Sequence, residues 1–354
     1  MSLFKNMLNA NESLFINPIF LDFDSIPKLL PYRENQQHYI ASCIKPLFQN
    51  RNGKNIILIG TPGIGKTATI KYIFRDLEEE TEDIIPIYIN CWKKETTYKI
   101  VLEICEQLDY KFTQNKNSEE LLKIIAKTLN KKAVVFCFDE IDKIKSIDII
   151  YTLLEDIYKK TIILITNENS FLNTLDQRIK SRLTPELVEF KPYNLEETKG
   201  ILKQRVEHSL VPNIIEKSLF EKIVQKTFEL QDIRIGLFLL KESATLAENQ
   251  SSKKINPENV EEAIKKLTIF KTKDTDELAK EEKQILGLIK QNPEIRIIDL
   301  YEIYKANNGD LSYRTFHTKL KKLEDASQIS LKKITGGKEG KFNIVSYEKK
   351  LTEF

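Results

Sequence analysis

The chain has 354 residues, 41% of them hydrophobic and 30% charged, which predicts a soluble globular protein of two or three domains. Lys and Arg number 55 against 52 Asp and Glu, so the net charge of +3 says nothing by itself about nucleic acid. No apolar run is long enough to span a bilayer and the first six residues lack the apolar core of a signal peptide, so we expect a cytoplasmic protein with no membrane partner.

Residues 1–192 alternate short apolar runs with amphipathic stretches. The expected strands are 55–59, 85–89, 133–138, 161–165 and 187–190, and the expected helices are 34–48, 66–79, 95–108, 118–129, 147–158 and 171–182. This alternation predicts an α/β nucleotide-binding domain with a parallel sheet and helices on both faces. Four widely spaced cysteines without a Cys-x-x-Cys pair predict buried free thiols rather than a zinc site or a disulfide framework.

The rest of the chain changes character twice. Residues 193–270 predict an all-α domain with helices at 195–208, 216–228, 234–248 and 257–267, followed by a charged linker at 271–277. Residues 277–354 predict a third domain, with helices at 278–291, 297–305 and 312–324 and a hairpin of strands at 327–334 and 341–345 around a glycine-rich loop. Three helices followed by a hairpin are the layout of a winged helix.

The most informative stretch is residues 60–67, Gly-Thr-Pro-Gly-Ile-Gly-Lys-Thr, which fits the phosphate-binding pattern G-x-x-x-x-G-K-[ST] between a strand and a helix. Its glycines let backbone N–H groups point at phosphate oxygens, and the helix N-terminus adds partial positive charge. Lys66 would neutralise the β- and γ-phosphates, and the Thr67 hydroxyl would bind Mg²⁺. The residues expected to hold the nucleotide here are Pro62, Gly63, Ile64, Gly65, Lys66, Thr67 and Ala68.

Two later strands end in polar residues. The run Val134-Val135-Phe136-Cys137-Phe138 ends in Asp139, expected to hold Mg²⁺, and Glu140, expected to orient the attacking water. The run 162–166 ends at Asn167, which could hydrogen-bond the water or the γ-phosphate, or could simply start a turn.

The ordered motifs Gly-Thr-Pro-Gly-Ile-Gly-Lys-Thr, Phe-Asp-Glu-Ile-Asp and Ile-Thr-Asn resemble those of AAA+ ATPases. Within that class, three further stretches resemble the archaeal replication initiators of the origin-recognition and cell-division-control family. They are the segment 30–36 near the expected adenine site, the segment 175–193 with its arginines, and Asp-Ile-Arg-Ile-Gly at 232–236. With the winged helix, the resemblance covers nearly the whole chain.

The resemblance implies ATP or ADP with Mg²⁺ as cofactors and slow, switch-like ATPase activity. It implies that Asn167 is sensor I, that Arg234 is sensor II, and that Arg182 is an arginine finger for a neighbouring subunit, with Arg178 as the competing finger. It also adds Tyr32, Arg33 and Tyr193 to the nucleotide-binding residues. Tyr32 stands where the family commonly has His, and Gln231 where it commonly has Gly. For each arginine, a surface salt bridge is the alternative interpretation.

Residues 312–323 form an amphipathic pattern. Tyr313, Phe316, Leu320 and Leu323 share one face at helical spacing, and the opposite face carries Arg314, Thr318, Lys321 and Lys322. In a winged helix this helix enters the major groove, so these four residues and Lys338 and Lys341 of the hairpin are the expected DNA contacts. A surface that binds protein is the alternative. A second DNA contact within 93–108 is implied by the resemblance alone, through Lys93, Lys94, Tyr98 and Lys99.

The resemblance therefore implies an origin-binding replication initiator that acts at the nucleoid. Its expected partners are double-stranded origin DNA, the replicative minichromosome maintenance helicase and other initiator subunits. The alternative is a regulatory AAA+ ATPase for signalling, transcription, or plasmid or virus maintenance, whose winged helix binds protein or promoter DNA. A chaperone-like remodeller is disfavoured because the sequence has no clear aromatic pore motif.

Overall fold

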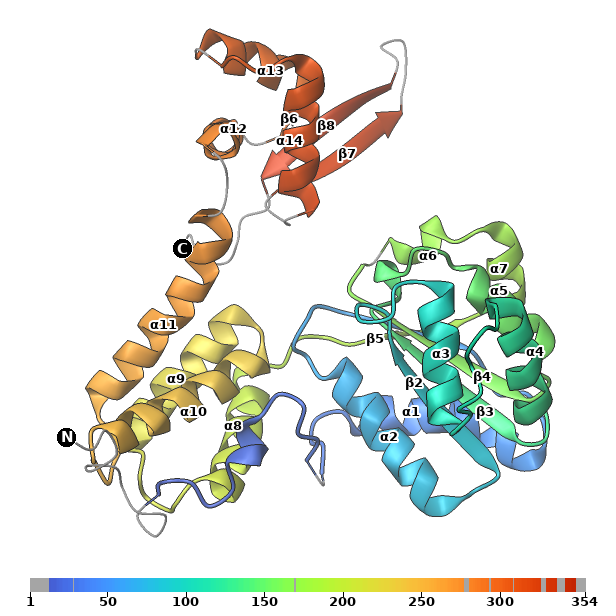
Figure 1. Ribbon diagram of the computed structural model, residues 1–354. Helices are drawn as coiled ribbons and strands as arrows, with labels where there is room; N and C mark the ends of the chain where they lie inside the picture. The colour runs from blue at the N-terminus through green and yellow to red at the C-terminus, as the bar shows by residue number, and fades with distance from the viewer. Residues whose placement is uncertain are drawn as a thin grey trace. The chain divides into compact units, whose positions relative to one another are not determined.

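A computed structural model describes residues 13–27, 29–168, 170–276, 280–292, 294–307, 309–325, 329–335 and 341–347. The chain divides into two compact units, Met1–Ile255 and Asn256–Phe354 (Figure 1). The predicted boundary between a nucleotide-binding domain ending at 192 and an α-helical domain starting at 193 falls inside the first unit, and it stays a prediction.

The first unit is built on a five-stranded parallel sheet with the order β2-β3-β4-β1-β5. The strands are β1 (Ile56–Ile59), β2 (Ile84–Asn90), β3 (Ala133–Asp139), β4 (Lys160–Thr166) and β5 (Glu186–Glu189). Each begins and ends within one residue of its predicted range. Because the strands are parallel, β1, β3 and β4 end at the same edge, where nucleotide sites form in such sheets.

Side chains of each strand alternate between two separate cores. Ile57 and Ile59 of β1 belong to one core, and Ile56 and Leu58 belong to the other. The first core is completed by α3 (Thr97–Gln107), α4 (Ser118–Leu129), α5 (Asp148–Asp156), α6 (Phe171–Thr174) and α7 (Gln177–Leu183). The second is completed by α1 (Glu34–Ile44), η3 (Lys45–Gln49) and α2 (Lys66–Glu80). The predicted two-faced α/β architecture is confirmed, and the four cysteines are buried and free.

One predicted helix is in fact two. The range 171–182 was expected to be continuous, but the helix ends at Thr174 and α7 begins at Gln177. Asp176 is the cause, because its side chain accepts a hydrogen bond from the backbone N–H of Arg178 at 2.8 Å and so caps a new helix. A short 3-10 turn, η4 (Ile141–Lys143), follows β3.

The first unit also contains a helical lid, formed by α8 (Leu195–Ser209), α9 (Lys217–Leu230) and α10 (Ile233–Asn249). A capping box at Asn194 and Glu197 starts α8. The N-terminal strap, residues 13–27 with the turn η2 (Pro18–Leu21), runs along this lid. Its backbone joins the end of α8 through the bonds from Ile16 N to Ser209 O and from Val211 N to Leu14 O, both 2.9 Å.

The second unit begins with α11 (Pro257–Asp276). The charged stretch at 271–277 was expected to be a linker, but α11 is helical through Asp276, and no Pro or Gly interrupts it after Pro257. The elements α12 (Lys280–Gln291), β6 (Ile295–Arg296), α13 (Ile297–Ala306), α14 (Tyr313–Asp325), β7 (Ile329–Thr335) and β8 (Lys341–Tyr347) follow. The antiparallel order β6-β8-β7 adds a short third strand to the predicted hairpin. The winged-helix layout is present, with the loop 336–340 outside the described residues.

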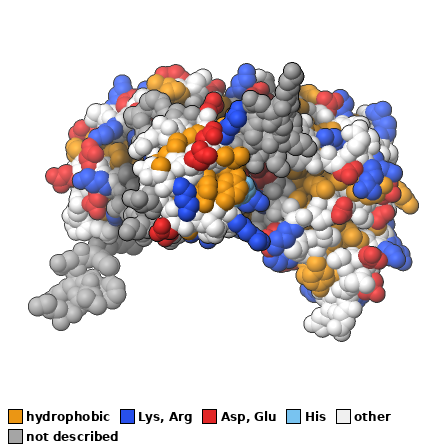
Figure 2. Space-filling model, turned by 90° about the horizontal axis from the view of Figure 1, so that it is seen from above, with side chains coloured by type: hydrophobic (Ala, Val, Ile, Leu, Met, Phe, Trp, Pro, Cys, Tyr) orange, Lys and Arg blue, Asp and Glu red, His pale blue; other side chains and the backbone are white. Residues whose placement is uncertain are grey.

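The surface carries both signs of charge. On the face drawn in Figure 2, Lys and Arg side chains are interspersed with Asp and Glu side chains, in keeping with the near balance of 55 and 52. Within the described ranges, no helix combines the length and the apolar character that a membrane crossing needs.

Candidate nucleotide-binding site

The phosphate loop leaves β1 and turns back into α2 through two glycines with left-handed backbone. Gly63 has φ +74° and Gly65 has φ +93°. A β-carbon at Gly63 would lie 1.9 Å from Oδ1 of Asp232, and one at Gly65 would lie 2.6 Å from the Tyr193 hydroxyl oxygen. Both the conformation and the close packing therefore require glycine at these positions.

Lys66 is buried at the start of α2, with 6% of its surface exposed. Its ammonium donates hydrogen bonds to Gly60 O at 2.6 Å, Thr61 O at 2.8 Å and Asn167 Oδ1 at 2.8 Å. Burial lowers the pKa of Lys66 to about 8. The structure thus brings the predicted phosphate-binding lysine against the side chain of the predicted sensor I residue.

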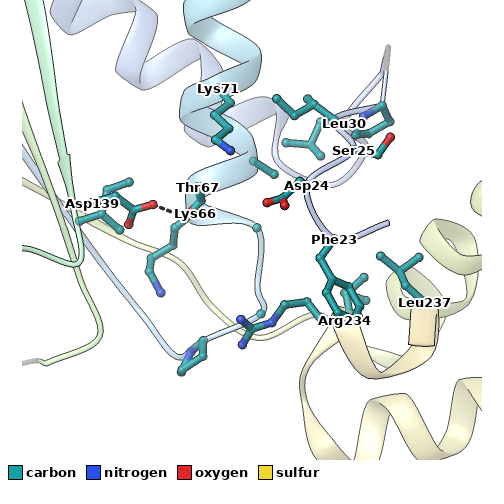
Figure 3. A pocket seen from close by; sticks show the side chains of 18 of the residues that line it. Phe23, Asp24, Ser25, Leu30, Lys66, Thr67, Lys71, Asp139, Arg234 and Leu237 are labelled. Atoms are coloured by element: carbon teal, nitrogen blue, oxygen red, sulfur yellow. Dashed lines mark hydrogen bonds between the residues drawn. The ribbon is translucent and has the colours of Figure 1, made fainter. Parts of the chain in front are cut away.

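Asp139 ends β3 beside the phosphate loop. Its Oδ2 accepts hydrogen bonds from the Thr67 hydroxyl and from the Tyr88 hydroxyl, each at 2.6 Å, and Figure 3 shows the Thr67 contact. Burial and the Asp139 charge raise the pKa of Tyr88, so this phenol stays protonated. A hydroxyl and a carboxylate in contact at the edge of a phosphate loop are the oxygen donors that Mg²⁺ uses together with nucleotide phosphates. Thr67 and Asp139 therefore fit the predicted metal.

Glu140 follows Asp139 in a left-handed backbone conformation, φ +55°, that is uncommon for a residue with a side chain. Burial raises the pKa of its carboxyl group, and the neighbouring carboxylates of Asp139 and Asp142 raise it further. Glu140 lines the cavity described below. An outlier of this kind at the end of a central strand is typical of functional sites.

Arg234 extends from the start of α10 toward the phosphate loop (Figure 3). Asp232 caps this helix, and its carboxylate forms a 2.8 Å ion pair with Arg234. The hydrogen bond to Asp232 is also the main cause that raises the pKa of the guanidinium. The backbone N–H of Ile233 reaches Gly63 O at 3.3 Å, so the lid touches the loop at this point.

A cavity of about 360 Å³ lies between the phosphate loop and the lid. Most of the predicted nucleotide residues line it: Pro62, Gly63, Gly65, Lys66, Thr67, Ala68, Asp139, Glu140, Asn167, Tyr193 and Arg234. Figure 3 shows that Phe23, Asp24 and Ser25 of the strap lie across the cavity from Asp139. The strap has no motif in the sequence, and its place in the wall depends on distant partners, so sequence reasoning missed it.

Three predicted nucleotide residues, Tyr32, Arg33 and Ile64, are not part of the cavity lining. Arg33 is buried, donates to Ile64 O at 2.9 and 3.1 Å and to Lys191 O at 2.8 Å, and lies over the Tyr193 ring at 3.8 Å. Tyr32 packs its hydroxyl against Gly200 of α8, where a β-carbon would lie 2.1 Å from that oxygen. Arg33 therefore fixes the loop through Ile64, and Tyr32 contacts the lid.

The two predicted finger arginines on α7 lie away from this cavity. Arg182 forms an ion pair with Glu155, and its guanidinium lies 5.0 Å from the centre of the Tyr151 ring. Arg178 is 80% exposed at its side chain and pairs with Asp176 at 3.3 Å. Arg178 is thus the more exposed of the two, and Arg182 is held by contacts within its own chain.

Helix α14 presents the predicted DNA-binding face. Arg314, Thr318, Lys321 and Lys322 are exposed, and Phe316, Leu320 and Leu323 are fully buried. Tyr313 was expected on the buried face but is 44% exposed. It starts the helix, and its ring contacts the rings of Tyr301 and His317. Lys338 lies outside the described residues, and Lys341 begins β8.

The implied second DNA contact is less open than expected. Lys94 pairs with Glu103 at 2.8 Å and Lys99 with Glu95 at 3.6 Å, while Tyr98 stays 43% exposed. Lys93 lines the nucleotide cavity.

Comparisons with known proteins identify the family. An AAA domain model matches residues 49–175, and a Cdc6 AAA+ ATPase-type lid domain model matches residues 199–265. The ORC1-type DNA replication protein 1 of Sulfurisphaera tokodaii is 32% identical over 267 residues, which are 72% of this chain and 67% of that protein. The chain belongs to the ORC1-type family of DNA replication proteins. The ORC1-type DNA replication protein 2 of Archaeoglobus fulgidus is 29% identical over 347 residues, 96% of this chain and 91% of that protein.

Two solved ORC proteins share the fold. The Aeropyrum pernix ORC1 protein in complex with DNA has a TM-score of 0.70 at 23% identity and covers 94% of this chain and 93% of that one. The ADP form of the Aeropyrum pernix ORC2 protein has a TM-score of 0.69 at 20% identity, covering 95% and 94%. The predicted family and the predicted AAA+ fold with its helical lid are confirmed. Membership makes this protein a AAA+ ATPase of the replication-initiator type.

Proposed function

We propose that this ORC1-type protein binds duplex origin DNA under the control of ATP and helps load the replicative minichromosome maintenance helicase. The main support for ATP binding is that the phosphate loop and the ends of β3 and β4 meet at one edge of the sheet. Lys66 touches Asn167, and Thr67 touches Asp139, beneath the lid that bears Arg234. Relatives named as DNA replication proteins and a neighbour solved with DNA support the DNA step.

The proposed hydrolysis divides the work among residues that already surround the cavity. Lys66 and Arg234 bind phosphate oxygens, Asn167 holds Lys66 in place, and Glu140 orients the attacking water. Thr67 and Asp139 would hold Mg²⁺, which supplies neutralising charge to the phosphates when bound. Arg182 would reach a neighbouring initiator subunit, so hydrolysis by a single subunit should be slow.

The choice of finger remains between Arg182 and Arg178. Arg182 must leave Glu155 and the Tyr151 ring to reach a neighbour, whereas Arg178 leaves only Asp176. Arg182→Ala and Arg178→Ala proteins mixed with Lys66→Ala protein on DNA would separate the two. The true finger variant keeps its own active site, so it should be inactive alone and regain turnover when a Lys66→Ala partner supplies the missing arginine. A variant of the other arginine should gain nothing from that partner.

The nucleotide site is tested by Lys66→Ala. This change removes the charge that faces the phosphates and should abolish ATP and ADP binding, measured by titration with a fluorescent nucleotide. The thermal unfolding midpoint without nucleotide serves as the control for folding. An unchanged ATP affinity would sink the assignment of the site.

The DNA step is tested by footprinting the purified protein, with and without ATP, on the DNA of its own replicon. ATP-dependent protection of one intergenic repeat is expected, and the Lys66→Ala protein should lose that dependence. Protection of promoters alone, or binding only to protein, would favour the regulatory alternative. A pull-down of purified replicative helicase by the DNA-bound protein tests the helicase step.

A further inference from the structure

Tyr88 is a residue of the nucleotide site that no motif in the sequence names. It lies two residues before the end of β2, next to β3, which ends in Asp139. Its hydroxyl donates a 2.6 Å hydrogen bond to Asp139 Oδ2, and its side chain lines the cavity. The ammonium of Lys71 lies 5.3 Å from the centre of its ring. Two charged groups on two other elements therefore hold this side chain.

Asp139 has little freedom in this arrangement. Asp139 is 3% exposed, and the hydroxyls of Thr67 and Tyr88 both donate to the same carboxylate oxygen. A threonine hydroxyl can donate its hydrogen to a carboxylate while its oxygen faces a metal ion. The Thr67 contact is therefore compatible with metal binding, and the Tyr88 contact needs no change when a metal arrives.

We propose that Tyr88 is a positioning residue for Mg²⁺, whose hydroxyl fixes the Asp139 carboxylate in the orientation that receives the ion. This inference rests on the proposed nucleotide site. Mg²⁺ demands near-ideal octahedral geometry, so the angle of each carboxylate that approaches it or its waters matters. Groups that orient metal ligands from outside the coordination sphere typically change metal affinity or activity by about 10- to 100-fold when removed.

Tyr88→Phe is a narrow test, because phenylalanine keeps the ring beneath Lys71 and removes only the hydroxyl. The measurement is binding of a fluorescent ADP to the full chain, first in EDTA and then across a titration of Mg²⁺. The affinity in EDTA gives the metal-free baseline of each protein. The Mg²⁺ concentration that gives half of the metal-dependent gain in affinity should rise about tenfold.

Turnover provides the second readout. ATP hydrolysis by Tyr88→Phe should be low at a Mg²⁺ concentration that saturates the wild type and should recover when Mg²⁺ is raised. If the Tyr88 hydroxyl only stabilised the fold, Tyr88→Phe would have a lower thermal unfolding midpoint than the wild type. Its Mg²⁺ dependence would then equal that of the wild type. Tyr72→Phe is the matched control, since Tyr72 lies on α2 in the same unit and packs against the second core.

The possible results separate the two proposals. A wild-type protein that binds no nucleotide defeats the proposed function and this inference with it. If Mg²⁺ raises the ADP affinity of the wild type and of Tyr88→Phe at the same concentrations, the role of Tyr88 is overturned and the proposed function stands. A rise in the required Mg²⁺ in Tyr88→Phe but not in Tyr72→Phe supports it.

Discussion

Lys66 shows how a single residue is prepared for its ligand. Three oxygen atoms already surround its ammonium, two from the phosphate loop and one from Asn167. Carbonyl dipoles do not neutralise a charge as phosphates do, and the site is buried, so the pKa falls to about 8. A bound polyphosphate would stabilise the charged form and raise that pKa again. Above pH 8, the charge of Lys66 therefore depends on the bound ligand.

This predicts that nucleotide affinity depends on pH in the alkaline range. Below pH 8 the free and bound forms both carry the proton, so affinity should be flat. Above pH 8 the free protein must take up a proton to bind, and at pH 9 the dissociation constant should be about tenfold higher than at pH 7. Titrations with ADP in EDTA keep metal ions out of the measurement.

Lys66→Arg is the control for the pH prediction, since a guanidinium stays protonated throughout this range. Its affinity, whatever its absolute value, should show no slope between pH 7 and pH 9. A flat profile in the wild type would contradict a lowered pKa at Lys66.

At the scale of elements, the local hydrophobic pattern predicted the strands and helices that local interactions form. The run 133–138 of β3 is apolar at every position and buried on both faces, and Asp139 marks its end. The bounds of this strand could therefore be predicted from the sequence. Residues 271–276 of the expected linker are helical, because a charged stretch without Gly or Pro is suited to a helix, and the linker role itself stays a prediction. The strap could not be predicted, because it packs through contacts to residues about 180 to 235 positions away.

The strap is held to the lid by Arg205 of α8. This arginine is 8% exposed and donates to Phe20 O at 2.9 Å and Ser25 O at 3.1 Å. Arg205→Met should free the strap and lower the free energy of unfolding by about 2 kcal/mol, the range for hydrogen bonds from a charged group. Hydrogen–deuterium exchange should then rise in residues 13–27. Lys203→Met, on the exposed side of the same helix, should change neither quantity.

The exposed residues of helix α14 have different expected DNA contacts, according to their position along the helix. Arg314 lies one residue from its start, where a recognition helix meets base edges, and Lys321 lies two turns later. Arg314→Ala should weaken binding to origin DNA by roughly 1–3 kcal/mol and leave binding to random duplex nearly unchanged, whereas Lys321→Ala should weaken both alike. Competition binding at fixed salt measures both. Equal losses in Arg314→Ala would make it a phosphate contact.

At the scale of the whole molecule, the nucleotide cavity and the winged helix belong to different compact units. The cavity and its wall lie within Met1–Ile255, while α14 and its hydrophobic core lie within Asn256–Phe354. Among the described residues of the second unit, the hydrophobic core draws its buried side chains from α12, α13, α14, β7 and β8, all within that unit. Because each unit has its own hydrophobic core, we expect each to fold independently of the other.

Phe316→Ala tests this independence. Phe316 is fully buried against Tyr301 and Tyr304, and its loss should cost about 3–5 kcal/mol, a large share of the stability of a small domain. We expect the variant to lose DNA binding and one calorimetric transition while its ADP affinity and the other transition stay at wild-type values. Ile298→Ala, a 59% exposed apolar position of the same unit, should leave both transitions in place. Loss of ADP affinity in Phe316→Ala would show instead that the first unit needs a folded winged helix to form its nucleotide site.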